Sequence, residues 1–250
     1  MFRRHDLVAI AVVAFGVLAI TAGCGVSQTS TTLSPDTAFY GSSVYVSPPD
    51  GQSTLAVAKI DEIKRVSGVS TAFTVYRFDA TSGAVELSGA ASTDSIVASD
   101  PSEAAWSGLK TQYAQGHAIE ADSSSEVVLG GVIAKELSKS VGDAIDLPLH
   151  PTGGTASHAF NVVGILELTG TGPDRFAYVN ITDGQMLLKD NLPAGQRDLV
   201  DVTTVATGID VYAKAGTSIA ELDKIADQIN KQVSGVKAVR PSQLLATIKR

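Results

Sequence analysis

The chain has 250 residues, of which 44% are hydrophobic and 18% charged, so it can bury the core of one ordinary domain or of two small ones. Its formal net charge of −7 at pH 7 argues against the clustered basic face with which proteins bind nucleic acids. The single cysteine, Cys24, excludes an internal disulfide and therefore a small disulfide-stapled scaffold.

An uncharged apolar segment, Leu7 to Val26, lies close to the N-terminus. It has about 20 residues, the length that a helix needs to cross a bilayer. Arg3 and Arg4 precede it, and the next basic residue is Lys59. By the positive-inside tendency, the N-terminus stays in the cytoplasm and the rest of the chain is exported. We therefore predict a membrane-targeting segment over residues 1–26 and favour an uncleaved transmembrane helix.

Two other fates of this segment stay open. The sequence "ITAGC", Ile20 to Cys24, is similar to the end of a bacterial lipoprotein signal, although Thr21 stands where a large aliphatic residue is commoner. In that case Cys24 would carry a lipid anchor. A cleaved signal peptide usually has a shorter apolar core and an Ala-x-Ala-like cleavage site, which this sequence lacks.

The exported part is predicted to begin with a linker and a strand–helix–strand unit. Residues 27–43 are rich in Ser and Thr and favour a linker. Val44 to Val46 favours a short strand, and Leu55 to Val66 has apolar residues near helical spacing. Val69 to Phe78 is rich in β-branched and aromatic residues, which favours a strand. Together they predict a compact βαβ-like unit.

The C-terminal part repeats this order. Val202 to Tyr212 is β-rich, and Val236 to Val239 predicts another strand. Between them, Ser218 and Glu221 form a capping box that predicts the start of a helix. One apolar stripe follows it: Ile219, Leu222, Ile225, Ala226 and Ile229. We predict that the two units are halves of one layer, so that this stripe packs on distant residues that include Ile60 and Ile63.

The middle of the chain is predicted to be mainly β-structure. Glu126 to Leu147 contains a short strand, a glycine break, a short helix, a turn and a second strand. Phe160 to Leu168 is apolar on both faces, as in a strand covered on both sides. Further predicted elements are a helix within Ala98 to Tyr113, a strand over Phe176 to Ile181, and a helix end with a loop over Met186 to Arg197. The fold class is therefore α+β.

Motifs of catalytic chemistry are missing from the sequence. It has no Gly-x-Ser-x-Gly elbow and no P-loop, and "GTG" at Gly170 to Gly172 lacks the third glycine of a dinucleotide fingerprint. His150 and His158 are expected to be solvated loop residues rather than metal ligands. Asn180 heads a glycosylation sequon, which matters only in a host that glycosylates exported proteins; we favour a strand-edge asparagine. We predict no enzyme activity, catalytic residue, metal or cofactor.

Three carboxylates and two aromatic residues have ordinary structural explanations. Asp143, Asp146 and Asp174 are expected at turns, where aspartate bonds to nearby backbone groups. Trp106 and Tyr113 are seven residues apart, a helical spacing that is more typical of packing than of a ligand platform. An exported domain of this kind, rich in structure and without a reactive cluster, is more often a binding or coupling module than an enzyme.

Two segments of the middle region carry a resemblance to a known family. The segments "EVVLGGVIAKELSKSVGDAIDL" and "FNVVGILELTGTGPDRFAYVNITDGQMLL" resemble the MacB-like periplasmic core domain of FtsX/MacB-type ABC transporter permeases. "QGHAIEAD" is similar to the family's Gly-Arg-x-Phe segment, although His117 and Ile119 depart from it. The positions that match the family's pattern are Val127 to Gly130, Ala134, Val141 to Asp143, Phe160 to Ile165 and Asp174 to Val179.

The resemblance implies an architecture. It is a porter-like subdomain of two βαβ-type halves with an inserted smaller β-rich subdomain, preceded by one N-terminal transmembrane helix. In this sequence the porter-like subdomain would comprise residues 44–98 and 200–250, and the insertion residues 99–199.

The resemblance also implies a function, that of a non-catalytic extracytoplasmic domain of an ABC transporter permease. Such a domain couples ATP-driven motion of a cytoplasmic ATPase to the exported part or engages cargo. The implied partners are that ATPase, further permease spans in the same or another chain, and a second copy in a dimer. The implied location is the cell membrane, with a single span and the bulk of the chain outside. The alternative is a lipoprotein binding module anchored at Cys24.

Overall fold

The computed structural model describes residues 33–86, 94–120 and 123–248. The predicted membrane segment and Cys24 lie outside these ranges. Among the residues that are described, no helix combines the length and the hydropathy that crossing a membrane requires.

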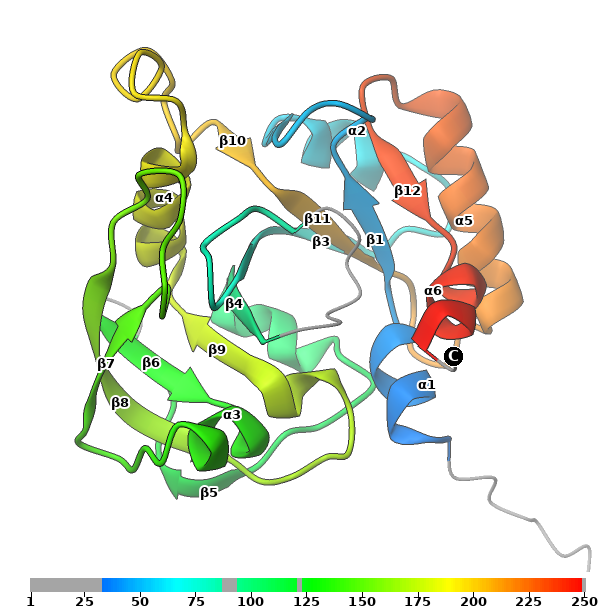
Figure 1. Cartoon of the computed structure of the whole chain (residues 1–250). Coiled ribbons are helices and arrows are strands. Elements are labelled where there is room, and N and C mark those ends of the chain that lie inside the picture. The colour runs from blue at the N-terminus through cyan, green and yellow to red at the C-terminus, as the bar shows by residue number, and fades with distance from the viewer. Residues whose placement is uncertain (1–32, 87–93, 121–122, 249–250) are drawn as a thin grey trace, which may run out of the picture. The chain divides into compact units, whose positions relative to one another are not determined.

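The described strands form one large sheet and one small one (Figure 1). The large sheet has ten strands in the order β12-β1-β11-β3-β4-β9-β6-β8-β5, and β7 pairs with β8 beside this path. In chain order its strands are β1 (Val44–Ser47), β3 (Thr71–Asp79), β4 (Ser95–Ser99), β5 (Tyr113–Gly116), β6 (Glu126–Leu129), β7 (Ala144–Leu147), β8 (His158–Leu166), β9 (Phe176–Val179), β11 (Gly208–Tyr212) and β12 (Lys237–Val239). The small sheet pairs β2 (Leu55–Ala56) with β10 (Val205–Ala206).

Short helices connect these strands. The α-helices are α1 (Pro35–Tyr40), α2 (Lys59–Lys64), α3 (Gly131–Glu136), α4 (Ile181–Asn191), α5 (Ile219–Gln232) and α6 (Pro241–Ile248). Two 3₁₀ turns, η1 (Pro101–Ala105) and η2 (Gly172–Arg175), complete the described helical elements. The mixture of helices and of parallel and antiparallel strands confirms the predicted α+β class.

Two strand–helix–strand units interlock at one end of the large sheet. β1 and β3 both run antiparallel to β11, so β1-α2-β3 is a unit of two parallel strands with a helix between them. β11 and β12 both run antiparallel to β1, so β11-α5-β12 is a second such unit. Their strands alternate in the order β12-β1-β11-β3, as in a split βαβ arrangement.

The apolar stripe of α5 packs where the sequence predicts. Leu222, Ile225 and Ile229 belong to one buried cluster with Ile63, and Ile60 packs against that cluster. The predicted capping box is also present. Ser218 Oγ accepts a hydrogen bond from the Glu221 amide (3.3 Å), and the Glu221 carboxylate accepts one from the Ser218 amide (2.9 Å). The predicted contact between the N-terminal and C-terminal strand–helix–strand units is therefore confirmed.

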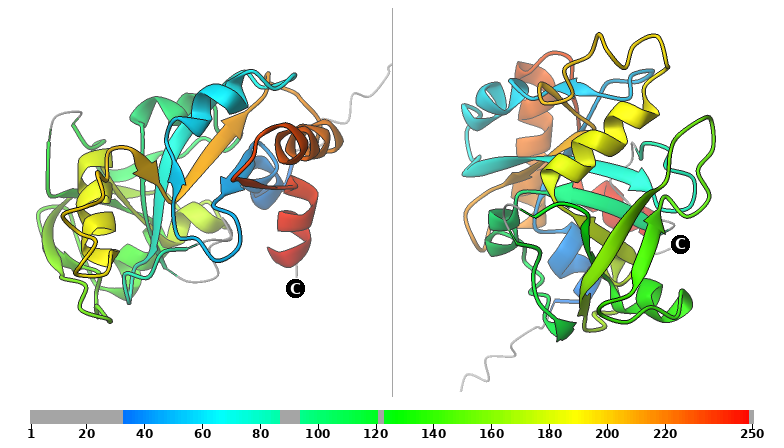
Figure 2. Two further views of the ribbon diagram at one scale, coloured as in Figure 1. Left: turned by 90° about the horizontal axis from the view of Figure 1, so that it is seen from above. Right: turned by 90° about the vertical axis from the view of Figure 1, so that its left-hand side faces the viewer.

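The middle strands extend the same sheet. β4 pairs with β3 in antiparallel fashion and with β9 in parallel fashion. A second buried cluster lies under α4, which contacts β3 and β4 and is the long helix coloured yellow in Figure 2. Gly184 allows this close packing, because a β-carbon at that position would lie 2.5 Å from the β-carbon of Ala98. The predicted strand, helix and strand within Glu126 to Leu147 correspond to β6, α3 and β7.

The helix predicted within Ala98 to Tyr113 is wrong. β4 continues to Ser99, and only the short turn η1 follows. The Asp100 carboxylate accepts hydrogen bonds from the amide and the hydroxyl of Ser102 (2.8 and 2.6 Å), which fixes a tight turn in front of Pro101. Trp106 and Tyr113 therefore do not share a helix face.

Other element boundaries also differ from the predictions. The helix predicted from Leu55 begins only at Lys59, because Leu55 pairs with Ala206 in the small sheet. Within the predicted linker 27–43, residues 35–40 form α1, which Ser34 caps through a hydrogen bond from Thr37 N. Ser34 and Pro35 are a typical helix start, which the Ser- and Thr-rich composition of the segment obscures. The C-terminal helix α6 was not predicted at all.

Candidate ligand-binding cavity

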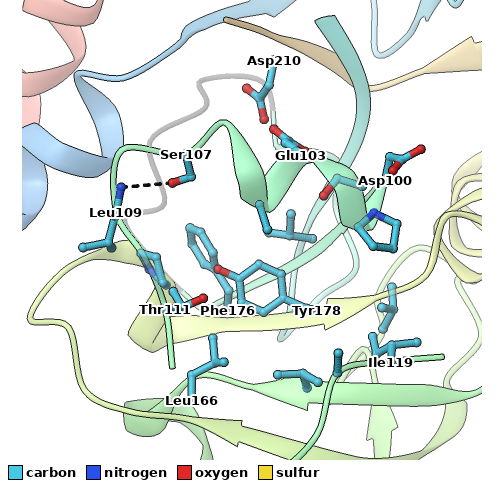
Figure 3. A pocket seen from close by; sticks show the side chains of 18 of the residues that line it. Asp100, Glu103, Ser107, Leu109, Thr111, Ile119, Leu166, Phe176, Tyr178 and Asp210 are labelled. Carbon is cyan, nitrogen blue, oxygen red and sulfur yellow. Dashed lines mark hydrogen bonds between the residues drawn. The ribbon is translucent and has the colours of Figure 1, made fainter. Parts of the chain in front are cut away.

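A cavity of about 770 Å³ lies beside the large sheet (Figure 3). Side chains from α1, β1, β3, η1, β9 and β11 line it, together with the segments that flank β5. Its volume is within the range of pockets that bind small molecules, roughly 300–1,000 Å³. It is therefore the candidate functional site of the described residues.

The strands that build the cavity have two different faces. On β11, Ile209 and Val211 point into the cluster beneath α5, whereas Asp210 and Tyr212 line the cavity. β1 follows the same rule, with Tyr45 on the cavity side between two buried valines. This division follows from the two-residue period of a strand, in which successive side chains point to opposite faces.

A buried ion pair crosses from β3 to β11. Arg77 Nη2 lies 2.8 Å from Asp210 Oδ2, and the two residues are 7% and 4% exposed. The Arg77 guanidinium also lies 5.3 Å from the ring centre of Tyr45, and its Nε has no hydrogen-bond partner among the described residues. Burial, the largest single influence, lowers the pKa of Arg77, but Asp210, Tyr45 and Glu103 together outweigh it and the pKa is raised. The Arg77 guanidinium therefore stays charged beside Asp210.

Glu103, on η1, is a buried acid beside this pair. One of its carboxyl oxygens accepts a hydrogen bond from the Tyr212 hydroxyl (2.8 Å). Burial, reinforced by the negative charge of Asp210, raises the pKa of Glu103 to about 8. A carboxyl group in this environment is largely protonated near neutral pH. Figure 3 shows Glu103 and Asp210 together at one end of the cavity.

Aromatic rings and aliphatic side chains form the other walls. Phe176 lies between Phe39 and Tyr178, at ring-centre distances of 5.9 and 5.7 Å. Burial raises the pKa of Tyr178, so its ring stays neutral at physiological pH. Leu166 and Ile119 lie at the end away from the two acids (Figure 3). The cavity therefore has an acidic end, an aromatic middle and an aliphatic end.

The walls have the composition of a small-molecule binding pocket. The lining contains neither histidine nor cysteine, so no imidazole base or thiolate nucleophile faces it. Over the ranges that the structure describes, no group of three or more His, Cys, Asp or Glu side chains could hold a metal ion. What the walls offer is apolar surface, aromatic faces and a few buried polar groups.

Neither His158 nor Asp146 lies where the sequence predicts. His158 begins β8, and its Nε2 lies 2.5 Å from Asp190 Oδ2 on α4, so it is a partly buried pair rather than a solvated loop residue. Asp146 lies within β7 and not at a turn. Asp143 and Asp174 do bond to nearby backbone amides; the Asp174 carboxylate accepts from the amides of Thr169 and Gly170 (2.7 and 2.8 Å).

Asn180 caps a helix. Its side-chain oxygen accepts a hydrogen bond from the Asp183 amide at the start of α4, and its side-chain nitrogen donates to the Ser123 carbonyl. Both ends of the amide are thus engaged in the fold. A glycan at Asn180 would have to displace the contact with Ser123.

The residues of the acidic end were missed in the sequence. Arg77 and Asp210 each stand inside a predicted strand that is otherwise mainly apolar or aromatic. Opposite charges in two such strands are a usable signal, because buried charges are normally paired. Glu103 gives no comparable signal, because it lies outside the apolar strands, in the segment where the sequence predicts a helix and the structure has η1.

Comparison with protein families now adds the decisive observation. The model of the MacB-like periplasmic core domain matches residues 7–241, nearly the whole chain. The chain belongs to this family. The resemblance seen in the two motif segments of the middle region is thereby confirmed.

Two solved structures resemble the MacB-like core domain described here. The periplasmic region of MacB from Actinobacillus actinomycetemcomitans is 11% identical, with a TM-score of 0.47, and the match covers 85% of this chain and 95% of that one. The extracellular domain of the noncanonical ABC-type transporter YknZ from Gram-positive bacteria is 10% identical, with a TM-score of 0.44, over 79% and 98% of the two chains. Comparison with curated protein sequences gives no match.

Proposed function

We propose that this MacB-like core domain is the non-catalytic extracytoplasmic part of an ABC transporter permease. Its role is to couple ATP-driven motion of a cytoplasmic ATPase to the exported domain, or to engage cargo there. The observation that carries the proposal is the family match over residues 7–241. The cavity supports it, because its mainly apolar and aromatic walls with a few buried polar groups are suited to binding.

The proposal includes a single membrane span over Leu7 to Val26, with the N-terminus in the cytoplasm and the bulk of the chain outside. The length of the apolar segment and the two arginines before it support this topology. The intact mass of the membrane-extracted protein tests it. We expect the full chain without a lipid, whereas a diacylglyceryl group on an N-terminal Cys24 would replace the span by a lipid anchor.

Helix α1 is the proposed link between the membrane segment and the cavity. It is the first described element after the predicted span, and Phe39 and Tyr40 both line the cavity. Tyr40 also packs with Leu244 and Leu245 of α6. Gly172 leaves room for the Tyr40 hydroxyl, since a β-carbon there would lie 2.2 Å from it. A displacement of α1 would therefore change the cavity wall directly.

The proposed division into residues 44–98 plus 200–250 and residues 99–199 gives the cavity a mechanical role. β1, β3 and β11 come from the first part, and η1 and β9 from the second. Relative motion of the two parts would change the shape of the cavity between their side chains. We propose that this is how the domain responds to ATP-driven motion, with two copies in the assembly.

Purification of the full-length chain from its native membrane tests the coupling role. We expect an ABC ATPase subunit to purify with it, and ATP turnover of that complex to change when Phe39→Ala loosens the packing of α1. Glu62→Gln, a change at a partly exposed position of α2, is the control and should leave turnover as in the wild type. Extraction of the chain without any ABC ATPase would refute the proposal.

A further inference from the structure

We infer that the cavity binds a hydrophobic organic cation, with the positive charge at Glu103 and the apolar body along the aromatic and aliphatic walls. The inference goes beyond the coupling role, because it concerns a binding event that this chain can perform alone. It rests on the charged residues that face the cavity, on the hydrogen-bond and ion-pair partners of its two basic residues, and on the succession of acidic, aromatic and aliphatic walls.

The charged residues of the lining favour a cation. Four are acidic and two are basic: Asp100, Glu103, Glu120 and Asp210, and Arg77 and Lys110. Both basic groups already have partners. Arg77 is paired with Asp210, and Lys110 Nζ donates to the carbonyls of Ala104 and Ala105 (3.1 and 3.0 Å). Lys110 is exposed, and Arg77, the buried basic group, is matched by Asp210, so an anion entering the cavity would meet more acidic than basic groups.

The Glu103 carboxyl is the one buried acid of the lining that is not neutralised by a basic side chain. Asp210 is matched by Arg77, whereas the hydrogen bond to Glu103 comes from the uncharged Tyr212 hydroxyl. A buried carboxylate without a counter-ion is costly, so the group keeps its proton instead. A cationic ligand would supply the missing counter-ion, and Glu103 would release its proton on binding.

The aromatic walls suit the same ligand. Tyr212 donates a hydrogen bond to Glu103 at the acidic end, and Tyr178 and Phe176 continue the aromatic surface toward Leu166. Their electron-rich faces attract cations, most strongly where water is excluded. Because burial keeps the tyrosines neutral, this wall adds no competing charge. The aliphatic end accepts the apolar body, so the site selects a molecule with both parts.

The titration of Glu103 depends on the groups that surround it. Asp210 and Tyr212 face it from β11, Arg77 faces it from β3, and Tyr178 lies across the cavity on β9. Asp210 opposes ionisation of Glu103, whereas Arg77 and the hydrogen bonds with Tyr212 and Ser99 favour it. Since burial is the largest influence and raises the pKa, binding of a cation should strengthen as the pH rises through about 8.

The test uses the full-length chain in neutral detergent and two probe ions of the same shape, tetraphenylphosphonium and tetraphenylborate. Trp106, the single tryptophan of the sequence, lies with its ring centre 6.4 Å from that of Tyr212 and reports on the acidic end of the cavity. We expect saturable quenching of its fluorescence by the cation at pH 8 and none by the anion. Partition of a probe ion into the detergent gives only a non-saturating change in the fluorescence, and this change is the same for all variants.

Glu103→Gln is the decisive variant, because it keeps the shape and hydrogen bonding of the protonated acid but cannot ionise. We expect its affinity for the cation to fall by about tenfold or more, the effect of losing one favourable charge contact of about 1.4 kcal/mol. Glu62→Gln removes a carboxylate outside the cavity lining and should bind like the wild type.

A wild-type titration keeps the test independent of any variant. Its affinity for the cation should rise by about tenfold between pH 6 and pH 9 as Glu103 ionises. Equal affinity of wild type and Glu103→Gln, equal binding of both probe ions, or the absence of saturable quenching would each overturn the inference. None of these results depends on an ATPase partner, so they are separate from the test of coupling.

Discussion

The two faces of β1 and β11 show how one part of the large sheet can serve two purposes. On one face, Val44, Ile209 and Val211 are buried against α5 and its apolar stripe. On the other face, Tyr45 and Asp210 lie beside the Arg77 guanidinium at the cavity. The first face is held by apolar burial that needs no particular partner, and the second by charges that need specific ones. We therefore interpret the first face as scaffold and the second as the site.

The largest effect is expected where a buried charge loses its partner. Arg77→Met leaves the Asp210 carboxylate unpaired and should lower the free energy of unfolding by about 3–5 kcal/mol. The double variant Arg77→Met/Asp210→Leu should recover most of this loss, because neither charge remains. Urea unfolding of the single and double variants measures it. A double variant as unstable as the sum of the single ones would show that the pairing of charges does not govern this face.

Truncation on the scaffold face should cost almost as much. Leu222→Ala removes a fully packed side chain beneath α5 and should lower the free energy of unfolding by about 2–5 kcal/mol. Lys224→Gln on the exposed side of the same helix should stay within about 0.5 kcal/mol of the wild type. Comparable effects of the two substitutions in urea unfolding would contradict the assignment of the α5 stripe to the core.

The pH dependence of stability should separate the two faces. Glu103 has a raised pKa in the folded chain, so its contribution to stability is complete below about pH 4.5 and is lost as the pH rises through about 8. Glu103→Gln cannot titrate and should therefore gain stability relative to the wild type over that interval, on the order of 1–3 kcal/mol. Unfolding of both proteins in urea at a series of pH values measures this gain. A constant difference across the series would mean that folding does not raise the pKa of Glu103.

The smallest expected effect concerns the start of α5. Ser218→Ala removes the hydroxyl that accepts from the Glu221 amide and should lower the free energy of unfolding by about 1 kcal/mol. Affinity for the cation probe should not change, because the cap lies outside the cavity lining. A loss of affinity in Ser218→Ala would show that the two faces are coupled.

The sequence predicts the scaffold better than the site, and the reason is physical. The α5 stripe, the capping box and the strands of the two units depend on local periodicity and on neighbouring residues, which are visible in one sequence. The cavity depends on Arg77, Glu103 and Asp210, which the fold brings together from three separate elements. In the sequence, only the charges of Arg77 and Asp210 inside two mainly apolar strands indicate the cavity.

The remaining differences have local causes. Asp100 and Pro101 start a tight turn, which replaces the longer helix predicted after β4. Leu55 pairs with Ala206, far along the chain, and this pairing delays the start of α2. His158 gains a partner on α4 that lies 32 residues away in sequence. In each case a specific hydrogen-bond or strand partner outweighed a pattern of spacing or composition.

The most direct test of the division between scaffold and site compares Leu222→Ala with Glu103→Gln in tetraphenylphosphonium titrations followed by Trp106 fluorescence. The measurement is made at pH 8 on full-length chain shown by urea unfolding to be folded. Leu222→Ala is expected to be less stable yet to bind the cation within about twofold of the wild type, whereas Glu103→Gln should stay folded and bind about tenfold more weakly. Weaker binding by Leu222→Ala together with wild-type binding by Glu103→Gln would contradict the account.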